Sequence, residues 1–319
     1  MGKELLNEVK YDSFQMNYIE QVLECWNNTL VNDLITKQRF IENILLDENF
    51  NPKLFKVAIF KNQIIGFCFG IKRKIPYLER GLEPKRGWIN MVGVDSKYQN
   101  IGIGTMLVKQ VEEELKQLGS EEITLCAYSP NYFTPGIDVK YEKGINFFEK
   151  NGYIFKGEAV SMQKNLFDYN VSDDYYSKVN ALQSEGIKII PFEEKYLLSL
   201  IDYALINFGS GWKRNILMAL QKGEANDTIL LCVDVNDNII GFCMRKIDGH
   251  DERFGPIGVS EELRSKGLGG ILFETMMMDM KSRGIPSLYF LWTSGAAQRF
   301  YERHGVKVYR KYRLYRKEI

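Results

Sequence analysis

The chain repeats itself, and this repeat limits the folds that are open to it. Gly102 and Gly267 lie 165 residues apart, and the same distance separates Gly93 from Gly258. Each pair marks a loop that follows an apolar, strand-like run and opens a helix-like run. Two loops that match at one register are much harder to ascribe to chance than one loop is. The 319 residues therefore predict two similar domains in succession.

Two further pairs of segments support the duplication. Ile64-Ile-Gly-Phe-Cys68 recurs as Ile239-Ile-Gly-Phe-Cys243, and Asn146-Phe-Phe-Glu-Lys-Asn-Gly152 corresponds to Arg299-Phe-Tyr-Glu-Arg-His-Gly305. The offset between the copies falls from 175 to 165 to 153 along the chain, so the second copy has shorter connections.

The order of segments within each copy predicts the fold class. A hairpin precedes each glycine loop, and helices and strands alternate after it. We expect an α/β fold in which each domain has a mixed, mostly antiparallel sheet flanked by helices. Because residues 167–185 are polar, we place a linker at 169–185, with room for one helical turn. The N-terminal domain is then 1–168 and the C-terminal domain 186–319.

Composition excludes several classes of function. The net charge of +1 gives no strong field that would attract nucleic acid or an anionic membrane. No run approaches the ~18 apolar residues of a membrane span, and the N-terminus lacks the apolar core of a signal peptide. The five cysteines are scattered, which is typical of reduced intracellular thiols, and two histidines do not favour a metal site. We expect a cytoplasmic protein without a metal.

Both glycine loops have the chemistry of a phosphate site. Their glycines leave room for a ligand to approach the backbone, and each helix start offers unpaired N–H groups and the positive end of a dipole. Arg264 and Lys266 add positive charge in the second loop. Neither loop completes a P-loop or a G-x-G-x-x-G nucleotide motif, since Leu107 and Leu272 occupy the last position of the latter.

The sequence of hairpin, strand, Gln/Arg-x-x-Gly-x-Gly, helix, strand and a helix ending in Phe-Tyr-x-x-x-Gly resembles the GNAT acetyltransferase superfamily. The resemblance covers roughly residues 9–166 and 187–317. It implies acetyl-coenzyme A (acetyl-CoA) as cosubstrate and direct acetyl transfer to the primary amine of a small molecule. It also implies that the loops hold the pyrophosphate and that the preceding strands pair with the pantetheine arm. The implied cofactor-binding residues are Val94, Gln99, Asn100, Gly102, Gly104 and Thr105, followed by Val259, Arg264, Ser265, Lys266, Gly267, Gly269 and Gly270.

One position distinguishes the two halves. GNAT proteins often carry a tyrosine four residues before the glycine of the last motif, where its hydroxyl protonates the leaving thiolate. Tyr301 holds this place in the second half, whereas the first half has Phe148. The resemblance therefore implies a catalytic C-terminal domain and an impaired or purely binding N-terminal domain. The alternative for Tyr301 is an aromatic residue packed beside Phe300.

The general base and the acceptor are less well defined. His250, Asp251 and Glu252 precede the strand before the second loop but are better explained as turn residues. In this superfamily the acceptor lies against the early helices, here at residues 207–214, where Trp212 either stacks on a sugar or anchors a loop. The tandem layout and the stretches 130–138 and 255–259 resemble glucosamine or glucosaminide N-acetyltransferases, which implies an amino sugar.

Other acceptors and other functions stay open. Aminoglycosides, polyamines and peptide N-termini all present amines, and a coenzyme A sensor without turnover would need the same loops. The basic, tyrosine-rich tail at 307–317 has a composition that nucleic-acid binding would use, but its alternation fits a closing strand with one wet face. We expect neither a nucleic-acid nor a membrane partner, and the sequence sets no oligomeric state.

Overall fold

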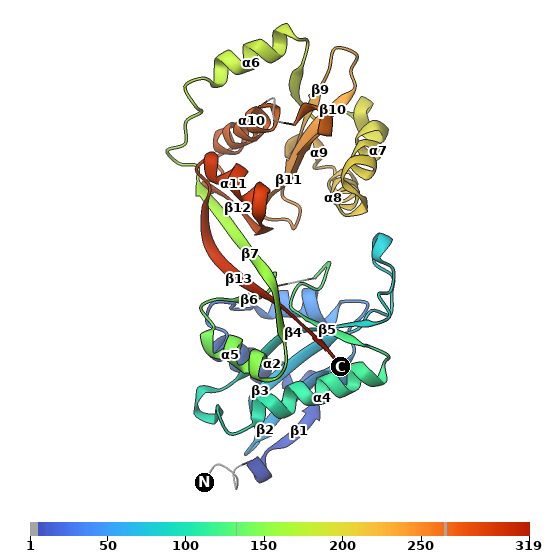
Figure 1. Ribbon diagram of the computed structural model, residues 1–319, viewed down its shortest axis with the longest axis vertical. Helices are drawn as coiled ribbons and strands as arrows, with labels where there is room; N and C mark the ends of the chain where they lie inside the picture. The colour runs from blue at the N-terminus through green and yellow to red at the C-terminus, as the bar shows by residue number, and fades with distance from the viewer. Residues whose placement is uncertain (1–5, 132, 265–266) are drawn as a thin grey trace. The chain divides into compact units, whose positions relative to one another are not determined.

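The computed structural model describes residues 6–131, 133–264 and 267–319 and divides into two compact units (Figure 1). Unit 1 consists of Met1–Ala159 and Arg310–Ile319, and unit 2 consists of Val160–Tyr309. The chain enters unit 2 within strand β7 (Ile154–Asn165) and returns to unit 1 within strand β13 (Lys307–Glu318). The last ten residues, which we had assigned to the C-terminal domain, therefore belong to the N-terminal unit.

Unit 1 is built around a mixed sheet. Four antiparallel strands follow in order, and a fifth runs parallel to the fourth: β1 (Lys10–Ser13), β2 (Phe55–Phe60), β3 (Gln63–Ile71), β4 (Arg86–Val94) and β5 (Glu122–Leu125). The end of β13 pairs antiparallel with β5, and the short β6 (Ile137–Asp138) also pairs with β13. The predicted mixed, mostly antiparallel sheet is confirmed.

The hairpin of β2 and β3 forms where the sequence predicted it. Lys61 and Asn62 connect the strands with φ angles of 48° and 63°. A two-residue turn with two positive φ angles has the twist that a hairpin requires. β3 is an apolar run that is buried on both faces, because helices cover the sheet on each side.

The two faces of this sheet carry different helices. α4 (Ile103–Gln117) packs Leu107, Val111 and Leu115 into one core cluster. α2 (Ile19–Thr29) packs Val22 and Trp26 into the other, where the indole stacks on the ring of Phe67 at 5.1 Å. This unit also contains the short α3 (Lys37–Phe40) and α5 (Glu142–Lys150).

Unit 2 repeats the plan. Its antiparallel sheet has the order β11 (Phe254–Val259), β10 (Ile239–Arg245), β9 (Ile229–Val233) and β8 (Lys188–Pro191). One face packs against α10 (Leu268–Ser282), and the other against α7 (Leu197–Phe208), α8 (Ser210–Gln221) and α9 (Ala225–Thr228). β12 (Ser287–Thr293) pairs with residues 160–165 of β7, and α11 (Gly295–Arg303) follows it.

The polar segment 169–185 is more ordered than a linker. It contains α6 (Tyr175–Ser184), a helix of ten residues. Before this helix, the Ser172 backbone N–H donates to Glu274 of α10 at 3.0 Å, and the Tyr175 hydroxyl lies 2.9 Å from that of Thr275. Its polar residues are thus partners for α10, which composition alone did not indicate.

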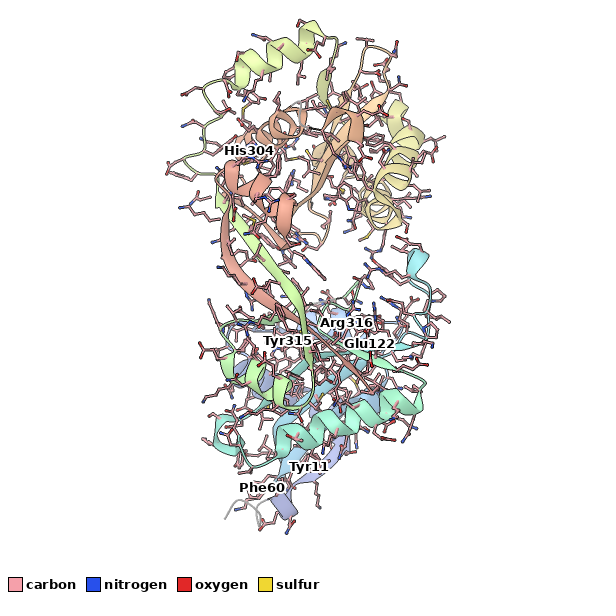
Figure 2. All side chains as sticks on the ribbon, in the orientation of Figure 1. Tyr11, Phe60, Glu122, His304, Tyr315 and Arg316 are labelled. Atoms are coloured by element: carbon pink, nitrogen blue, oxygen red, sulfur yellow. The ribbon has the colours of Figure 1, made fainter. Side chains whose placement is uncertain are left out.

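The basic tail forms strand β13, whose residues from Arg310 onward belong to unit 1. Tyr312 and Tyr315 are buried, and the Tyr315 hydroxyl donates to Glu149 at 2.6 Å. Figure 2 shows Tyr315 and Arg316 beside Glu122, whose carboxylate lies 3.5 Å from the Arg316 guanidinium. The two buried tyrosines are three residues apart and so lie on opposite faces of the strand, which means that the tail lacks the single wet face that the sequence suggested. None of the helices in the described part of the chain combines the length and the apolar character that crossing a bilayer requires.

Candidate active site

The central parallel strands of unit 1 diverge and open a cleft. β4 and β5 pair from Arg86 and Glu122 to Ile89 and Leu125. β5 ends there, because Cys126 and the next residue both adopt a φ of 57°, whereas β4 continues to Val94. The cleft between the separated ends has a volume of about 950 Å³, which is large enough for a sizeable ligand.

The first glycine loop forms one end of this cleft. Gly102 caps α4 with a φ of 102°, and no side chain caps the free N–H groups of the first turn. A Cβ at Gly104 would make ordinary van der Waals contact with the ring of Phe147, at 3.5 Å, and Gly104 itself lines the cleft. This uncapped helix start beside an open cleft fits a pyrophosphate.

All six residues predicted for the first half line the cleft, namely Val94, Gln99, Asn100, Gly102, Gly104 and Thr105. Gln99 has a further role, since its side-chain amide donates to the carbonyl of Val94 at 2.9 Å. This bond braces the loop against the end of β4. The lysines of the neighbouring α5 region, Lys143 and Lys150, also line the cleft and are exposed.

Another part of the cleft wall is acidic. Arg310 of β13 binds Asp33 through both carboxylate oxygens, at 2.8 and 3.1 Å, and donates from Nε to Asp138 at 2.6 Å. The side chain of Asp138 is 1% exposed and that of Asp33 is 11% exposed. We call these three residues the acidic cluster. Two carboxylates with one guanidinium leave a net negative charge, which favours a cationic group in the cleft.

A tyrosine and a cysteine complete this wall. The Tyr141 hydroxyl accepts a hydrogen bond from the backbone N–H of Asn32 at 3.0 Å. Burial and the neighbouring Asp33 raise the pKa of Tyr141, so this phenol stays protonated at neutral pH. Burial likewise raises the pKa of Cys126 to about 12, which leaves a poorly nucleophilic thiol. Phe148, at the place of the expected tyrosine, lines the cleft with an apolar ring.

The strands of unit 2 also diverge before the second glycine loop. β11 and β12 are joined by a bridge between Arg253 and Tyr289, and they belong to different sheets. Gly267 caps α10 with a φ of 81°, without a side-chain cap. A Cβ added at Gly269 would lie 3.9 Å from the ring of Phe300, as one at Gly104 would lie beside Phe147 in unit 1.

The other residues predicted for the second loop are in mixed surroundings. Val259 is buried at the end of β11, and Arg264 is exposed, with its guanidinium 3.6 Å from Glu261. A Cβ at Gly270 would lie 3.0 Å from the His304 ring, so this glycine is needed for helix packing. Ser265 and Lys266 lie outside the described residues.

Tyr301 lies within an aromatic cluster. Its ring centroid is 4.3 Å from Phe290, 5.1 Å from Phe300 and 5.5 Å from Phe273. Burial raises the pKa of its hydroxyl. These contacts account for the side chain as packing, and its role as a proton donor stays a prediction.

Trp212 also packs within unit 2. It stacks on Phe208 at 4.2 Å, and both rings cover Gly258 of β11, where a Cβ would lie 2.4 Å from Phe208 and 2.8 Å from Trp212. Gly258 is therefore required for this close approach. These contacts match the loop-anchor alternative, and stacking on a sugar stays untested.

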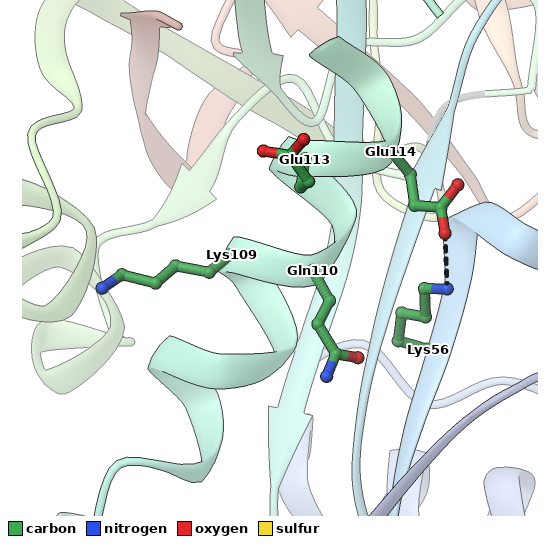
Figure 3. Close-up of a pocket in the computed structure, with 5 residues that line it drawn as sticks. All are labelled: Lys56, Lys109, Gln110, Glu113 and Glu114. Carbon is green, nitrogen blue, oxygen red and sulfur yellow. Dashed lines mark hydrogen bonds and ion pairs between the residues drawn. The ribbon is translucent and has the colours of Figure 1, made fainter. Parts of the chain in front are cut away.

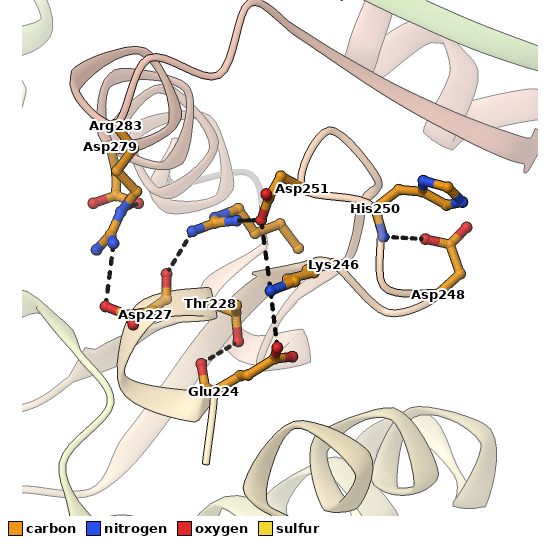
Figure 4. A network of polar contacts seen from close by, with 10 residues as sticks. Glu224, Asp227, Thr228, Lys246, Asp248, His250, Asp251, Asp279 and Arg283 are labelled. Carbon is orange, nitrogen blue, oxygen red and sulfur yellow. Dashed lines mark hydrogen bonds and ion pairs between the residues drawn. The ribbon is translucent and has the colours of Figure 1, made fainter. Parts of the chain in front are cut away.

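The residues His250, Asp251 and Glu252 belong to a turn held by charges. Asp251 accepts from Arg245 at 2.9 Å and lies 3.8 Å from Lys246, while the His250 N–H donates to Asp248 at 3.2 Å (Figure 4). The Glu252 carbonyl accepts from the backbone N–H of Tyr289 in β12. The turn thus fixes the start of β11, which matches the interpretation of these three residues as turn residues.

A second hollow, of about 540 Å³, lies on the outer face of α4. Lys56 and Glu114 form an ion pair of 3.0 Å in it, and Lys109, Gln110 and Glu113 form the rest of its lining (Figure 3). Long, solvated side chains of both signs form this surface, and it lacks a glycine loop or a strand edge. We therefore take the cleft of unit 1 as the candidate active site.

Sequence reasoning missed the acidic cluster and Asn90, a buried residue of β4 that also lines the cleft. Asp138 ends the stretch 130–138 that suggested an amino-sugar enzyme, so part of the signal was present. Asp33 and Arg310 are 277 positions apart, and no local pattern connects them.

Comparisons with known proteins agree with this geometry. Residues 2–153 match the profile of the acetyltransferase (GNAT) family, and residues 226–308 match that of an acetyltransferase (GNAT) domain. A search of curated protein sequences finds no match.

Several solved structures share the fold. A fungal multi-domain GH3 β-N-acetylglucosaminidase, described as containing a GCN5-related glucosamine N-acetyltransferase region, aligns with a TM-score of 0.75 and 21% identity. The alignment covers 97% of this chain and 38% of that protein, so this chain spans well under half of that relative. A GCN5-related N-acetyltransferase from Sphaerobacter thermophilus aligns with a TM-score of 0.70 and 15% identity over 98% of this chain and 96% of that one. A tandem GNAT protein from the clavulanic acid biosynthesis pathway gives 0.62 and 11%, over 98% of both chains.

Proposed function

The chain belongs to the GNAT acetyltransferase family, and from this premise we propose that it is an acetyl-CoA-dependent N-acetyltransferase whose transfer site is the cleft of unit 1. Bound acetyl-CoA supplies an acetyl thioester. The observation that carries the proposal is the cleft itself, which joins an uncapped helix start, a free strand edge and an acidic wall.

Different residues of unit 1 would bind different parts of acetyl-CoA along the cleft. The first turn of α4 behind Gly102 would hold the pyrophosphate, and Lys143 and Lys150 would attract further phosphate charge. The edge of β4 up to Val94 would pair with the pantetheine arm through its backbone groups. With the cofactor held in this way, its acyl end would lie toward the point where β4 and β5 separate.

The acidic cluster supports an amine as the acceptor. A primary amine is largely protonated at neutral pH, and the carboxylates of Asp33 and Asp138 would hold its ammonium form before attack. Arg310 fixes both carboxylates, so their positions do not depend on the substrate. We propose a small-molecule amine, and an amino sugar is the first candidate because one region of the fungal relative is described as a GCN5-related glucosamine N-acetyltransferase.

The sequence predicts that acetyl transfer occurs in the C-terminal domain, with Tyr301 as the proton donor. That allocation remains the competing proposal, because unit 2 also has a glycine loop beside diverging strands. The packing of Tyr301 among phenylalanine rings supports a structural role, and the cleft in unit 1 supports transfer there.

A matched pair of loop variants tests the allocation. Gly104→Asp and Gly269→Asp place the same carboxylate at corresponding helix positions in the two units. We expect Gly104→Asp to abolish acetyl-CoA-dependent thiol release with an amine panel and Gly269→Asp to retain it. The panel contains glucosamine, an aminoglycoside, a polyamine and a peptide. Loss of turnover in Gly269→Asp alone would move the site to unit 2, and binding without turnover on any amine would identify a sensor.

A further inference from the structure

Asn90 is a buried amide that the fold of unit 1 does not use. Its residue is 3% exposed, and among the described residues neither Nδ2 nor Oδ1 has a hydrogen-bond partner. Leaving a buried donor and acceptor unpaired is destabilising, and such groups in native proteins are rare. Hence Asn90 calls for an explanation that folding does not provide.

The backbone of β4 sets this side chain apart. In the pairing with β3, Ile89 is opposite Gly70 and Met91 is opposite Phe69, so Asn90 is the extra residue of a β-bulge. Bulges redirect side chains and occur beside active sites. The Asn90 carbonyl lies 3.5 Å from the Cys126 thiol, so its backbone is engaged while its side chain is not.

The bulge lies at the point of the cleft where β4 and β5 separate. It follows directly on Ile89, the last residue of β4 that pairs with β5, and Asn90 lines the cleft. The neighbouring polar groups already have partners in the fold: the thiol of Cys126 faces the Asn90 carbonyl, and Asp33 and Asp138 bind Arg310, although their carboxylates keep lone pairs that an ammonium group could use. Asn90 therefore has a free donor and a free acceptor at the point where the strands separate.

An amide matches the two reactants of acetyl transfer. The acyl oxygen of a thioester can only accept a hydrogen bond, and a primary amine can donate one. We propose that Asn90 positions both reactants, with Nδ2 donating to the acyl oxygen and Oδ1 accepting from an N–H of the amine. This inference rests on the proposed function of the unit 1 cleft. A donor aimed at the oxygen on which charge develops is worth about 10²–10³ in kcat.

Asn90→Leu removes both polar atoms with little change in shape, and Asn49→Leu is the matched control. Asn49 is 6% exposed in the same unit, but its amide is fully used: it donates to Tyr128 at 2.7 Å and accepts from two backbone N–H groups. We expect Asn90→Leu to unfold at the wild-type temperature or higher, because it removes an unsatisfied amide. Asn49→Leu should unfold at a lower temperature.

Two functional readouts complete the experiment. Asn90→Leu should lower kcat on the accepted amine by about a hundredfold or more. Titration calorimetry should show that it loses the preference of the wild-type chain for acetyl-CoA over coenzyme A, and this readout needs no turnover. Asn90→Asp, which keeps only acceptors, should show the same loss. A lower unfolding temperature for Asn90→Leu, with unchanged kcat and unchanged preference, would overturn the proposal. If the wild-type chain acetylates no amine, the proposed function fails, and the affinity ratio still decides the role of Asn90.

Discussion

Arg310 and Asp33 form a bidentate ion pair, with distances of 2.8 and 3.1 Å between guanidinium and carboxylate atoms, although 277 positions separate them. Asp33 follows α2 and lines the cleft of unit 1, and Arg310 lies in β13, so the last strand of the chain holds a carboxylate of this cleft in place. Removal of this strand would leave two buried carboxylates without their shared cation.

We expect Arg310→Leu to destabilise unit 1 strongly. Breaking a buried ion pair by removing one partner costs about 3–5 kcal/mol, because a charge stays buried without compensation. Arg313→Leu on the same strand is the control: its ion pair with Glu149 is 3.8 Å long and 44% exposed on each side, and such pairs contribute about 0–1 kcal/mol. Urea unfolding followed by tryptophan fluorescence measures both. Equal losses in the two variants would show that the cluster does not support the unit.

The tyrosines of the two units provide a second comparison. Tyr141→Phe removes a hydroxyl that lines the cleft and contacts Asn32 and Asp33. We expect it to reduce kcat/KM for the amine by about tenfold or more, on the scale of a lost acid or positioning group. Tyr301→Phe should retain turnover if transfer occurs in unit 1. The sequence predicts the reverse result for Tyr301, so steady-state kinetics on both variants separates the two allocations.

We expect the cysteine thiols of the folded protein to be unreactive. All five cysteines are buried, and burial raises the pKa values of Cys25, Cys126 and Cys232 to about 12 each. Because the reactive thiolate is suppressed, we expect iodoacetamide to label the native protein at pH 8 far more slowly than the urea-unfolded protein. Mass spectrometry after incubation with acetyl-CoA should find no acetyl group on Cys126. A stoichiometric adduct there would contradict direct transfer.

Local features of the fold could be predicted from the sequence because each has a local cause. The Lys61-Asn62 turn, the uncapped starts of α4 and α10 and the apolar stripe of α4 all depend on residues close in sequence. The residues of the first glycine loop are also close in sequence; they line the cleft, and their binding of the cofactor stays a prediction.

The assignment of the last strand to unit 1 could not be predicted from local sequence in this way. Only Tyr312 and Tyr315 of β13 are buried, and the sequence of this strand does not specify the strand with which it pairs. Two interactions attach this strand to unit 1: its pairing with β5 and the contact of Arg310 with Asp33 and Asp138. Both depend on tertiary structure. The role of Asn90 could not be predicted for a related reason, because the hydrophobic pattern of a strand does not show where a β-bulge occurs.

His304 should make unit 2 sensitive to acid. Its ring lies 3.5 Å from Glu274 and against Gly270, and burial lowers its pKa below the ordinary 6.5 despite the opposing effect of Glu274. In the unfolded chain the imidazole binds a proton near pH 6.5, whereas in the folded chain it stays neutral until lower pH. The unfolded state therefore binds more protons in this range, and stability should fall as pH falls from 7.5 through 5.5.

His304→Gln should flatten this dependence, and His250→Gln, in an exposed turn, should leave it unchanged. NMR titration of the two imidazoles with urea unfolding at both pH values provides the measurement. A His304 pKa above 6.5 would mean that attraction to Glu274 outweighs desolvation, and stability would then increase toward acid.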